Sequence, residues 1–165
     1  MKKFLALLLT LVLIFSFTTA LADFDELPNH KMLDIFSSTD DYFNDIENDS
    51  VTRVLFVYLA MCDCLESGIL DLNEIRGDYI CAGSLLDFLY YVFIPLKNDQ
   101  MLTVMVTTTG SCNYLITDDT PITSKTAMIT CLNGLKNNNS LDDYWFVPAD
   151  DIVTMATAAA DVTGN

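Results

Sequence analysis

Residues 88–117 read FLYYVFIPLKNDQMLTVMVTTTGSCNYLIT, and this stretch says most about the architecture of the chain. Apolar side chains alternate along 88–96, with Phe88, Tyr90, Val92 and Ile94 on one side and Leu89, Tyr91 and Phe93 on the other. The same period of two continues over 101–109 and 112–117, and short polar segments separate the three runs. This pattern predicts three antiparallel strands joined as a meander, with Tyr114 and Ile116 facing inward.

Helices are expected along the chain both before and after the meander. Between residues 51 and 65 only Thr52, Arg53 and Asp63 are polar, and Asp49-Ser50 can cap a helix that ends at Gly68. A strand of this length would be unusual, so a helix buried on most sides is predicted, although the β-branched content keeps a strand as the alternative. The remaining expected elements are short helices over 28–36 and 39–46, a turn of helix over 70–76, an amphipathic helix over 122–135, an edge strand over 144–147 and a terminal helix over 152–160.

This order of elements predicts an α+β fold. We expect N-terminal helices, an antiparallel meander of three or more strands and a C-terminal helix packed on one face of the sheet. All helices are expected on that same face.

The first 22 residues have the features of a secretory signal peptide. Lys2 and Lys3 precede an apolar run from Phe4 to Phe17, and Ala20-Leu21-Ala22 forms an A-x-A cleavage site. The alternative is a membrane anchor, but the apolar run is shorter than the roughly 20 residues that span a bilayer. We therefore expect a secreted protein, of bacterial type, with cleavage after Ala22, a single acidic domain over 23–165 and no stable membrane insertion after cleavage.

The charge of the chain restricts its partners. It has 23 acidic residues against 8 Lys and Arg, a net charge of −15, and loss of the signal would remove two lysines and no acid. A nucleic-acid binder needs a basic surface, so that class is excluded. An anionic membrane surface is disfavoured for the same reason. Cationic partners or cations suit such a charge, although solubility alone can also explain it.

Five cysteines are candidates for disulfide bonds in an exported chain: Cys62, Cys64, Cys81, Cys112 and Cys131. The alternative is that most are small buried apolar residues. His30 is the only histidine, and no C-x-x-C, nucleophile or nucleotide-binding motif is present, so neither a cofactor nor a metal centre is predicted. An EF-hand loop starting at Asp45 fails because Ser50 and Phe56 replace the required Gly and Glu. Arg76-Gly77-Asp78 is an adhesion tripeptide that is more simply explained as a turn.

One group of large side chains on the predicted sheet is a candidate ligand or partner surface: Tyr90, Tyr91, Phe93, Met105 and Tyr114. A second helix layer or a partner in a homodimer could cover these residues instead. The sequence therefore favours an exported, non-catalytic binding protein whose partner is a protein or a small molecule, a cationic one being compatible with the charge. The alternatives are an extracellular enzyme with an Asp/Tyr pocket between sheet and helices, and a cation-binding surface protein.

Overall fold

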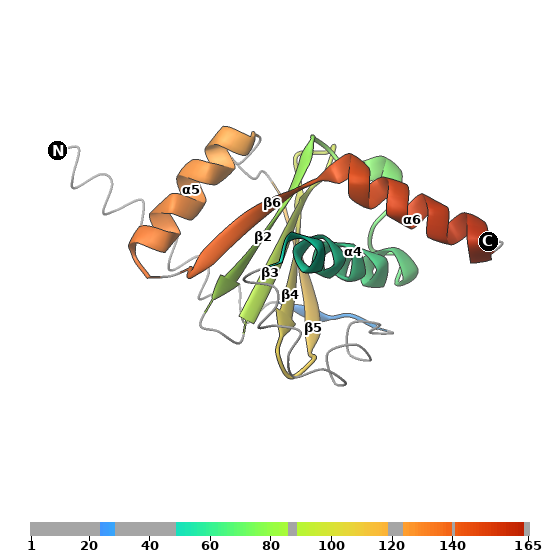
Figure 1. Cartoon of the computed structure of the whole chain (residues 1–165), viewed down its shortest axis with the longest axis horizontal. Coiled ribbons are helices and arrows are strands. Elements are labelled where there is room, and N and C mark those ends of the chain that lie inside the picture. The colour runs from blue at the N-terminus through green and yellow to red at the C-terminus, as the bar shows by residue number, and fades with distance from the viewer. Residues whose placement is uncertain (1–23, 29–48, 86–88, 119–123, 140, 164–165) are drawn as a thin grey trace.

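The computed structural model describes residues 24–28, 49–85, 89–118, 124–139 and 141–163. The signal segment, His30, Phe88 and, apart from Pro28, the two short helices expected over 28–46 lie outside these residues. Within the described part, six strands form one antiparallel sheet in the order β1-β5-β4-β3-β2-β6 (Figure 1). The strands are β1 (Asp25–Glu26), β2 (Tyr79–Leu85), β3 (Leu89–Pro95), β4 (Met101–Thr107), β5 (Cys112–Thr117) and β6 (Asp143–Pro148).

The predicted meander is confirmed as β3, β4 and β5. Leu89 pairs with Thr107 and Pro95 with Met101, and Met101 pairs in turn with Thr117. The first turn places Asp99 at a positive φ of 62°, and the second places Gly110 at 90°, a conformation that glycine adopts without strain. One side chain differs from the prediction: Ile116, expected to face inward, is 39% exposed.

Strand β2 is the main element that the sequence did not indicate. It pairs with β3 on one side and with β6 on the other, so Ala82 lies between Val92 and Trp145. Gly83 lies in close contact with β6, because a Cβ at this position would be 3.0 Å from the carbonyl oxygen of Asp143. The small residues of β2 thus allow close packing against a strand that arrives much later in the chain.

Helix α4 (Ser50–Glu66) confirms the helix predicted at this position. The Asp49 carboxylate accepts hydrogen bonds from the backbone N–H groups of Val51 and Thr52, and the chain leaves the helix at Ser67 and Gly68, the latter with φ of 71°. The expected burial on most sides holds over residues 56–64, seven of which are buried, whereas Val51 is 71% and Leu55 37% exposed. A one-turn 3₁₀ helix, η1 (Leu72–Glu74), lies within the expected turn of helix.

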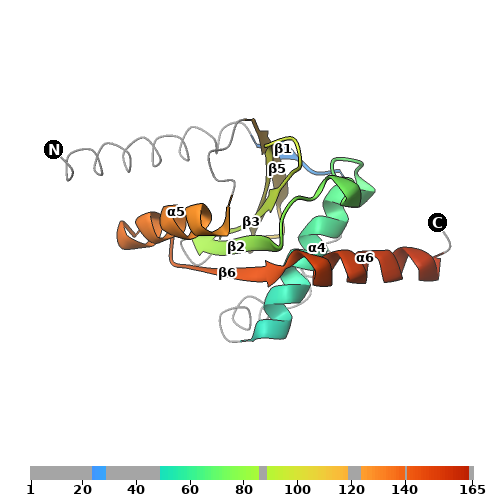
Figure 2. The same cartoon turned by 90° about the horizontal axis from the view of Figure 1, so that it is seen from above.

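Helices α4 and α6 (Ala149–Thr163) pack on one face of the sheet, and α6 follows β6 without a loop (Figures 1 and 2). The core on this face is the larger of the two apolar clusters. Its fully buried members from the two helices include Phe56, Met61 and Ile152, and those from the sheet include Ile80, Val92, Leu102 and Val104.

Helix α5 (Lys125–Asn137) lies on the opposite face (Figure 1). Met128, Leu132 and Leu135 of this helix pack on Cys81, Leu89, Tyr91 and Phe93 of the sheet. The helices therefore lie on both faces and not on one, and α5 is the second helix layer that the sequence allows as a cover for Tyr91 and Phe93. The physical reason is that β3 is apolar on both faces, so each face needs a cover.

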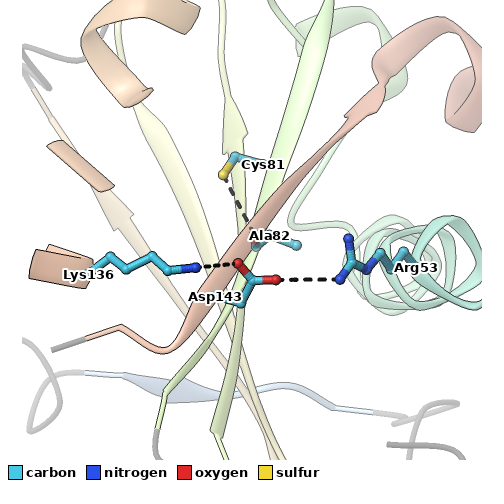
Figure 3. A network of polar contacts seen from close by, with 5 residues as sticks. All are labelled: Arg53, Cys81, Ala82, Lys136 and Asp143. Carbon is cyan, nitrogen blue, oxygen red and sulfur yellow. Dashed lines mark hydrogen bonds and ion pairs between the residues drawn. The ribbon is translucent and has the colours of Figure 1, made fainter. Parts of the chain in front are cut away.

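The edge strand β6 is held to helices on both faces through Asp143. Its carboxylate accepts a 2.8 Å hydrogen bond from Lys136 Nζ of α5 and lies 3.4 Å from Arg53 of α4 (Figure 3). Burial raises the pKa of Asp143, but the hydrogen bonds from Lys136 and from the backbone N–H of Tyr144, together with the nearby positive charges, outweigh burial and hold the pKa below its ordinary value. The Asp143 carboxylate thus links two helices that lie on opposite faces of the sheet.

Candidate functional site

A hollow of about 270 Å³ lies between the first turn of α5 and the sheet, and we call it the α5 hollow. Its floor is formed by the buried side chains of Cys81, Phe93, Met101 and Met128. Its rim carries polar and aromatic residues: Arg76, Asp78, Tyr79, Lys125 and Phe146. A broader, shallower depression lies over 65–74, but one continuous segment from the end of α4 through η1 lines it, whereas the α5 hollow joins strands, a loop and a helix.

The residues of the rim come from different helices and strands. Ser124 caps α5 by accepting a 3.2 Å hydrogen bond from the backbone N–H of Ala127, and this cap places Lys125 at the first helical position. Tyr79 begins β2, and Phe146 of β6 pairs in register with Cys81, so the two aromatic rings lie on the same face of the sheet. These rings are 6.3 Å apart between centroids and nearly perpendicular, at 84°.

The charged groups of the rim have different surroundings. The Lys125 ammonium lies 3.5 Å from the centroid of the Tyr79 ring and 5.0 Å from that of Phe146. Arg76 forms an ion pair with Asp99 of the β3–β4 turn. The carboxylate of Asp78 makes no hydrogen bond or ion pair within the described residues, and only its backbone carbonyl is used, by the N–H of Ala149. The rim therefore combines an ammonium held on aromatic rings with an exposed carboxylate.

The five residues of the surface expected from the sequence lie on two faces. Tyr90 is 2% exposed and packs on Phe56 beneath α4, and Tyr114 lies against the same core. Tyr91, Phe93 and Met105 lie on the α5 face, where burial raises the pKa of Tyr91 to about 12. Of the five, Phe93 lines the α5 hollow. The tripeptide Arg76-Gly77-Asp78 is part of its rim, a placement that no local pattern in the sequence indicates.

None of the five cysteines, all of which are among the described residues, forms a disulfide bond. Cys64, Cys81 and Cys112 are buried, and burial raises the pKa of each, to about 12 for Cys64. Cys62 and Cys131 are partly exposed. The raised pKa values make the three buried thiols poor nucleophiles at neutral pH.

Asp63 is a charged residue that is fully buried on α4, in contact with the core. The Cys112 thiol of β5 hydrogen bonds to it, and the charge of Asp63 contributes, after burial, to the raised pKa of Cys112. The sequence shows Asp63 only as one polar position in an apolar helix. The group is closed to solvent, so it serves the core and not the α5 hollow.

Metal binding and membrane insertion have no support in the described part of the chain. No group of three or more His, Cys, Asp or Glu is placed to hold a metal ion among these residues, which do not include the acidic segment 40–48. None of the helices described is long and apolar enough to cross a bilayer.

Searches with this chain found no matching protein family, no matching curated protein and no matching solved structure.

Proposed function

We propose that this chain is a small exported protein that binds a small molecule in the α5 hollow and has no catalytic activity of its own. The observation that carries the proposal is the combination of an apolar floor with a polar, aromatic rim in one cavity of about 270 Å³. Ligand sites in proteins are mostly apolar with a few polar groups that fix orientation. The volume is slightly below the usual lower limit of about 300 Å³, so the ligand is small.

Export is supported by the segment 1–22, with its basic start, apolar middle and A-x-A end. N-terminal sequencing of secreted material should begin at Asp23. Recovery of membrane-bound protein that retains Met1 would contradict export.

An extracellular enzyme is the second candidate, because Asp78 and Tyr79 both line the hollow. A carboxylate and a phenol can act as general base and acid when a substrate lies within hydrogen-bond reach. Two observations favour binding. The face of the Tyr79 ring is occupied by the Lys125 ammonium, and Asp78 is the single carboxylate among the described lining residues, whereas most glycosidases use a pair.

Methionine methyl groups provide a direct test, since two of them line the hollow. In protein with ¹³C-methyl methionine, a fragment set of organic acids, alcohols and amines should contain molecules that shift the NMR signals of Met101 and Met128. Met61 is the control, because it is buried in the core on the opposite face. Fragments that shift Met61 alone, or none of the three, would contradict the α5 hollow as the binding site.

Mass spectrometry then separates binding from catalysis. Each fragment that binds is incubated with the protein and analysed for products. An unchanged fragment supports the binding protein, and conversion that is lost in Asp78→Asn would establish the enzyme instead.

A further inference from the structure

Lys125 places its own ammonium on two aromatic rings at the rim of the α5 hollow. We call the pair Tyr79 and Phe146 the aromatic corner. The ammonium lies 3.5 Å and 5.0 Å from the two ring centroids, within the roughly 6 Å over which a cation is attracted to the negative face of a ring. The corner is thus already shaped for an ammonium group.

The contact between Lys125 and the corner is weak enough to be replaced. Lys125 is exposed, and its Nζ makes no hydrogen bond or ion pair within the described residues. Its side chain is flexible and attached at a helix end, so it can move into solvent without disturbing the floor of the hollow. The ammonium is therefore an exchangeable occupant.

The surroundings of the corner fit a cation that carries an apolar tail. The floor beside it is formed by Met101, Met128 and Phe93, all buried. Asp78 adds an exposed carboxylate at the rim, and the net charge of −15 attracts cations to the protein as a whole.

We propose that the α5 hollow binds a small alkylammonium ion. Its head group replaces the Lys125 ammonium on the aromatic corner, and its tail lies on the apolar floor. This inference rests on the proposed function, since it names the class of ligand for the same hollow. Lys125 then acts as a tethered competitor that lowers the affinity for the free cation.

The opposite charge is the main alternative, because Arg76 and Lys125 could attract an organic anion. The structure favours the cation, since Arg76 is already paired with Asp99 and Lys125 is turned onto the rings. The anion is therefore one outcome of the test.

Three probes with the same six-carbon tail distinguish the charges: hexyltrimethylammonium, hexanol and hexanoate. We expect hexyltrimethylammonium to bind the purified protein most tightly and to shift the Met101 and Met128 methyl signals. Lys125→Ala should bind it about two- to fivefold more tightly, because the competing ammonium is removed. Tyr79→Leu should weaken binding by about fivefold.

Lys136→Ala is the matched control. Lys136 lies on the same helix and carries the same charge, but it bonds to Asp143 at the other end of α5. Any gain from the change in net charge alone will appear in both lysine variants. Lys125 is exposed, so the comparison of the two variants decides the question even if Tyr79→Leu does not fold.

Three results would overturn the inference. Tighter binding of hexanoate or hexanol would contradict the cation, and an equal change in affinity in Lys125→Ala and Lys136→Ala would contradict the replacement of the Lys125 ammonium on the aromatic corner. Either result would leave a binding site in the hollow. If none of the three probes shifts Met101 or Met128 in the wild type or in Lys125→Ala, the inference fails, and the fragment screen decides separately whether the proposed function fails with it.

Discussion

Leu55 and Leu59 are one helical turn apart on α4, yet they have different surroundings. Leu59 is 8% exposed and belongs to the core beneath the helix, whereas Leu55 is 37% exposed. The two positions have the same chemistry and the same helix, so the difference in burial is the only large variable between them.

We expect Leu59→Ala to lower the free energy of unfolding by about 2–5 kcal/mol, through loss of apolar burial and the cavity that remains. Leu55→Ala should cost less, about 1 kcal/mol, since more than a third of the residue is already in water. Chemical denaturation of both variants measures this. Equal losses at the two positions would mean that α4 presents a different face to the sheet.

At the scale of elements, the pairing of β2 with β6 depends on Gly83. A Cβ there would lie 3.0 Å from the carbonyl oxygen of Asp143 and 3.2 Å from Leu141 Cδ1. Gly134, in the last turn of α5, has nothing within 4 Å of the same position. We therefore expect the substitution of alanine for glycine to have opposite effects on stability at these two positions.

Gly83→Ala should destabilise the protein by about 1–3 kcal/mol, because a backbone oxygen must move to admit the methyl group. Gly134→Ala should stabilise it by about 0.5–1 kcal/mol, since alanine is the better helix former. Thermal and urea unfolding of both variants tests the pair. A neutral Gly83→Ala would show that β6 can move away from β2 without loss.

The link from β6 to both helices predicts a dependence on pH. The pKa of Asp143 is lower in the folded protein than its ordinary value of 3.8, so its contribution to stability is present above about pH 4 and is lost as the pH falls through the folded pKa. The pKa of Lys136 is raised above 10.5, so its contribution is lost as the pH rises through the folded value.

Asp143→Asn should therefore lower the melting temperature at pH 7, by no more than a few degrees because the ion pairs are partly exposed, and the difference should shrink below about pH 4. A double-mutant cycle with Lys136→Met, followed by melting curves from pH 3 to pH 8, measures the link. Additive effects at pH 7 would show that the two side chains do not interact.

Sequence patterns identified the elements whose signal is local. Strands β3 to β5 alternate in apolar character, and α4 has a capping Asp49 and a Gly68 that ends it. Strand β2 gave no such signal, because its residues Cys81, Ala82, Gly83 and Ser84 are small and its position depends on two partner strands. An amphipathic pattern shows that α5 buries one side, but not which face of the sheet it covers.

The α5 hollow could not be predicted for the same reason. Its rim brings together Asp78, Lys125 and Phe146 from three separate segments, and their approach depends on the late pairing of β6 with β2. In the sequence, Arg76-Gly77-Asp78 stands out as an adhesion tripeptide and Phe93 as part of the aromatic surface on the predicted sheet, and neither pattern indicates a shared cavity. Spacing along the chain carries no information about such a meeting of segments.

For the whole molecule, the dominant electrostatic property is the net charge of −15. With 8 Lys and Arg against 23 acidic residues, most carboxylates cannot be paired, so they repel one another in the compact state. Salt reduces this repulsion, because the Debye length falls from roughly 30 Å at 0.01 M to about 8 Å at 0.15 M.

The melting temperature should therefore be higher in 0.15 M than in 0.01 M sodium chloride, about the range over which screening becomes effective. Calcium should add more than sodium at matched ionic strength only if carboxylates converge into a site. Differential scanning calorimetry in the two salts measures both effects. A melting temperature that falls with sodium chloride would show that specific ion pairs outweigh the repulsion.

The strand order has a consequence for how the chain reaches this structure. Tyr79 of β2 pairs with Pro148 of β6, strands that are far apart in the sequence, whereas the β2–β3, β3–β4 and β4–β5 pairs each join strands that follow one another along the chain. Contacts between distant residues form late, because a long loop must close first. During synthesis, β2 to β5 can assemble while one side of β2 still lacks its partner strand. An unpaired edge of this kind readily joins another chain, so the interval before β6 arrives is when the newly made protein is most prone to aggregate.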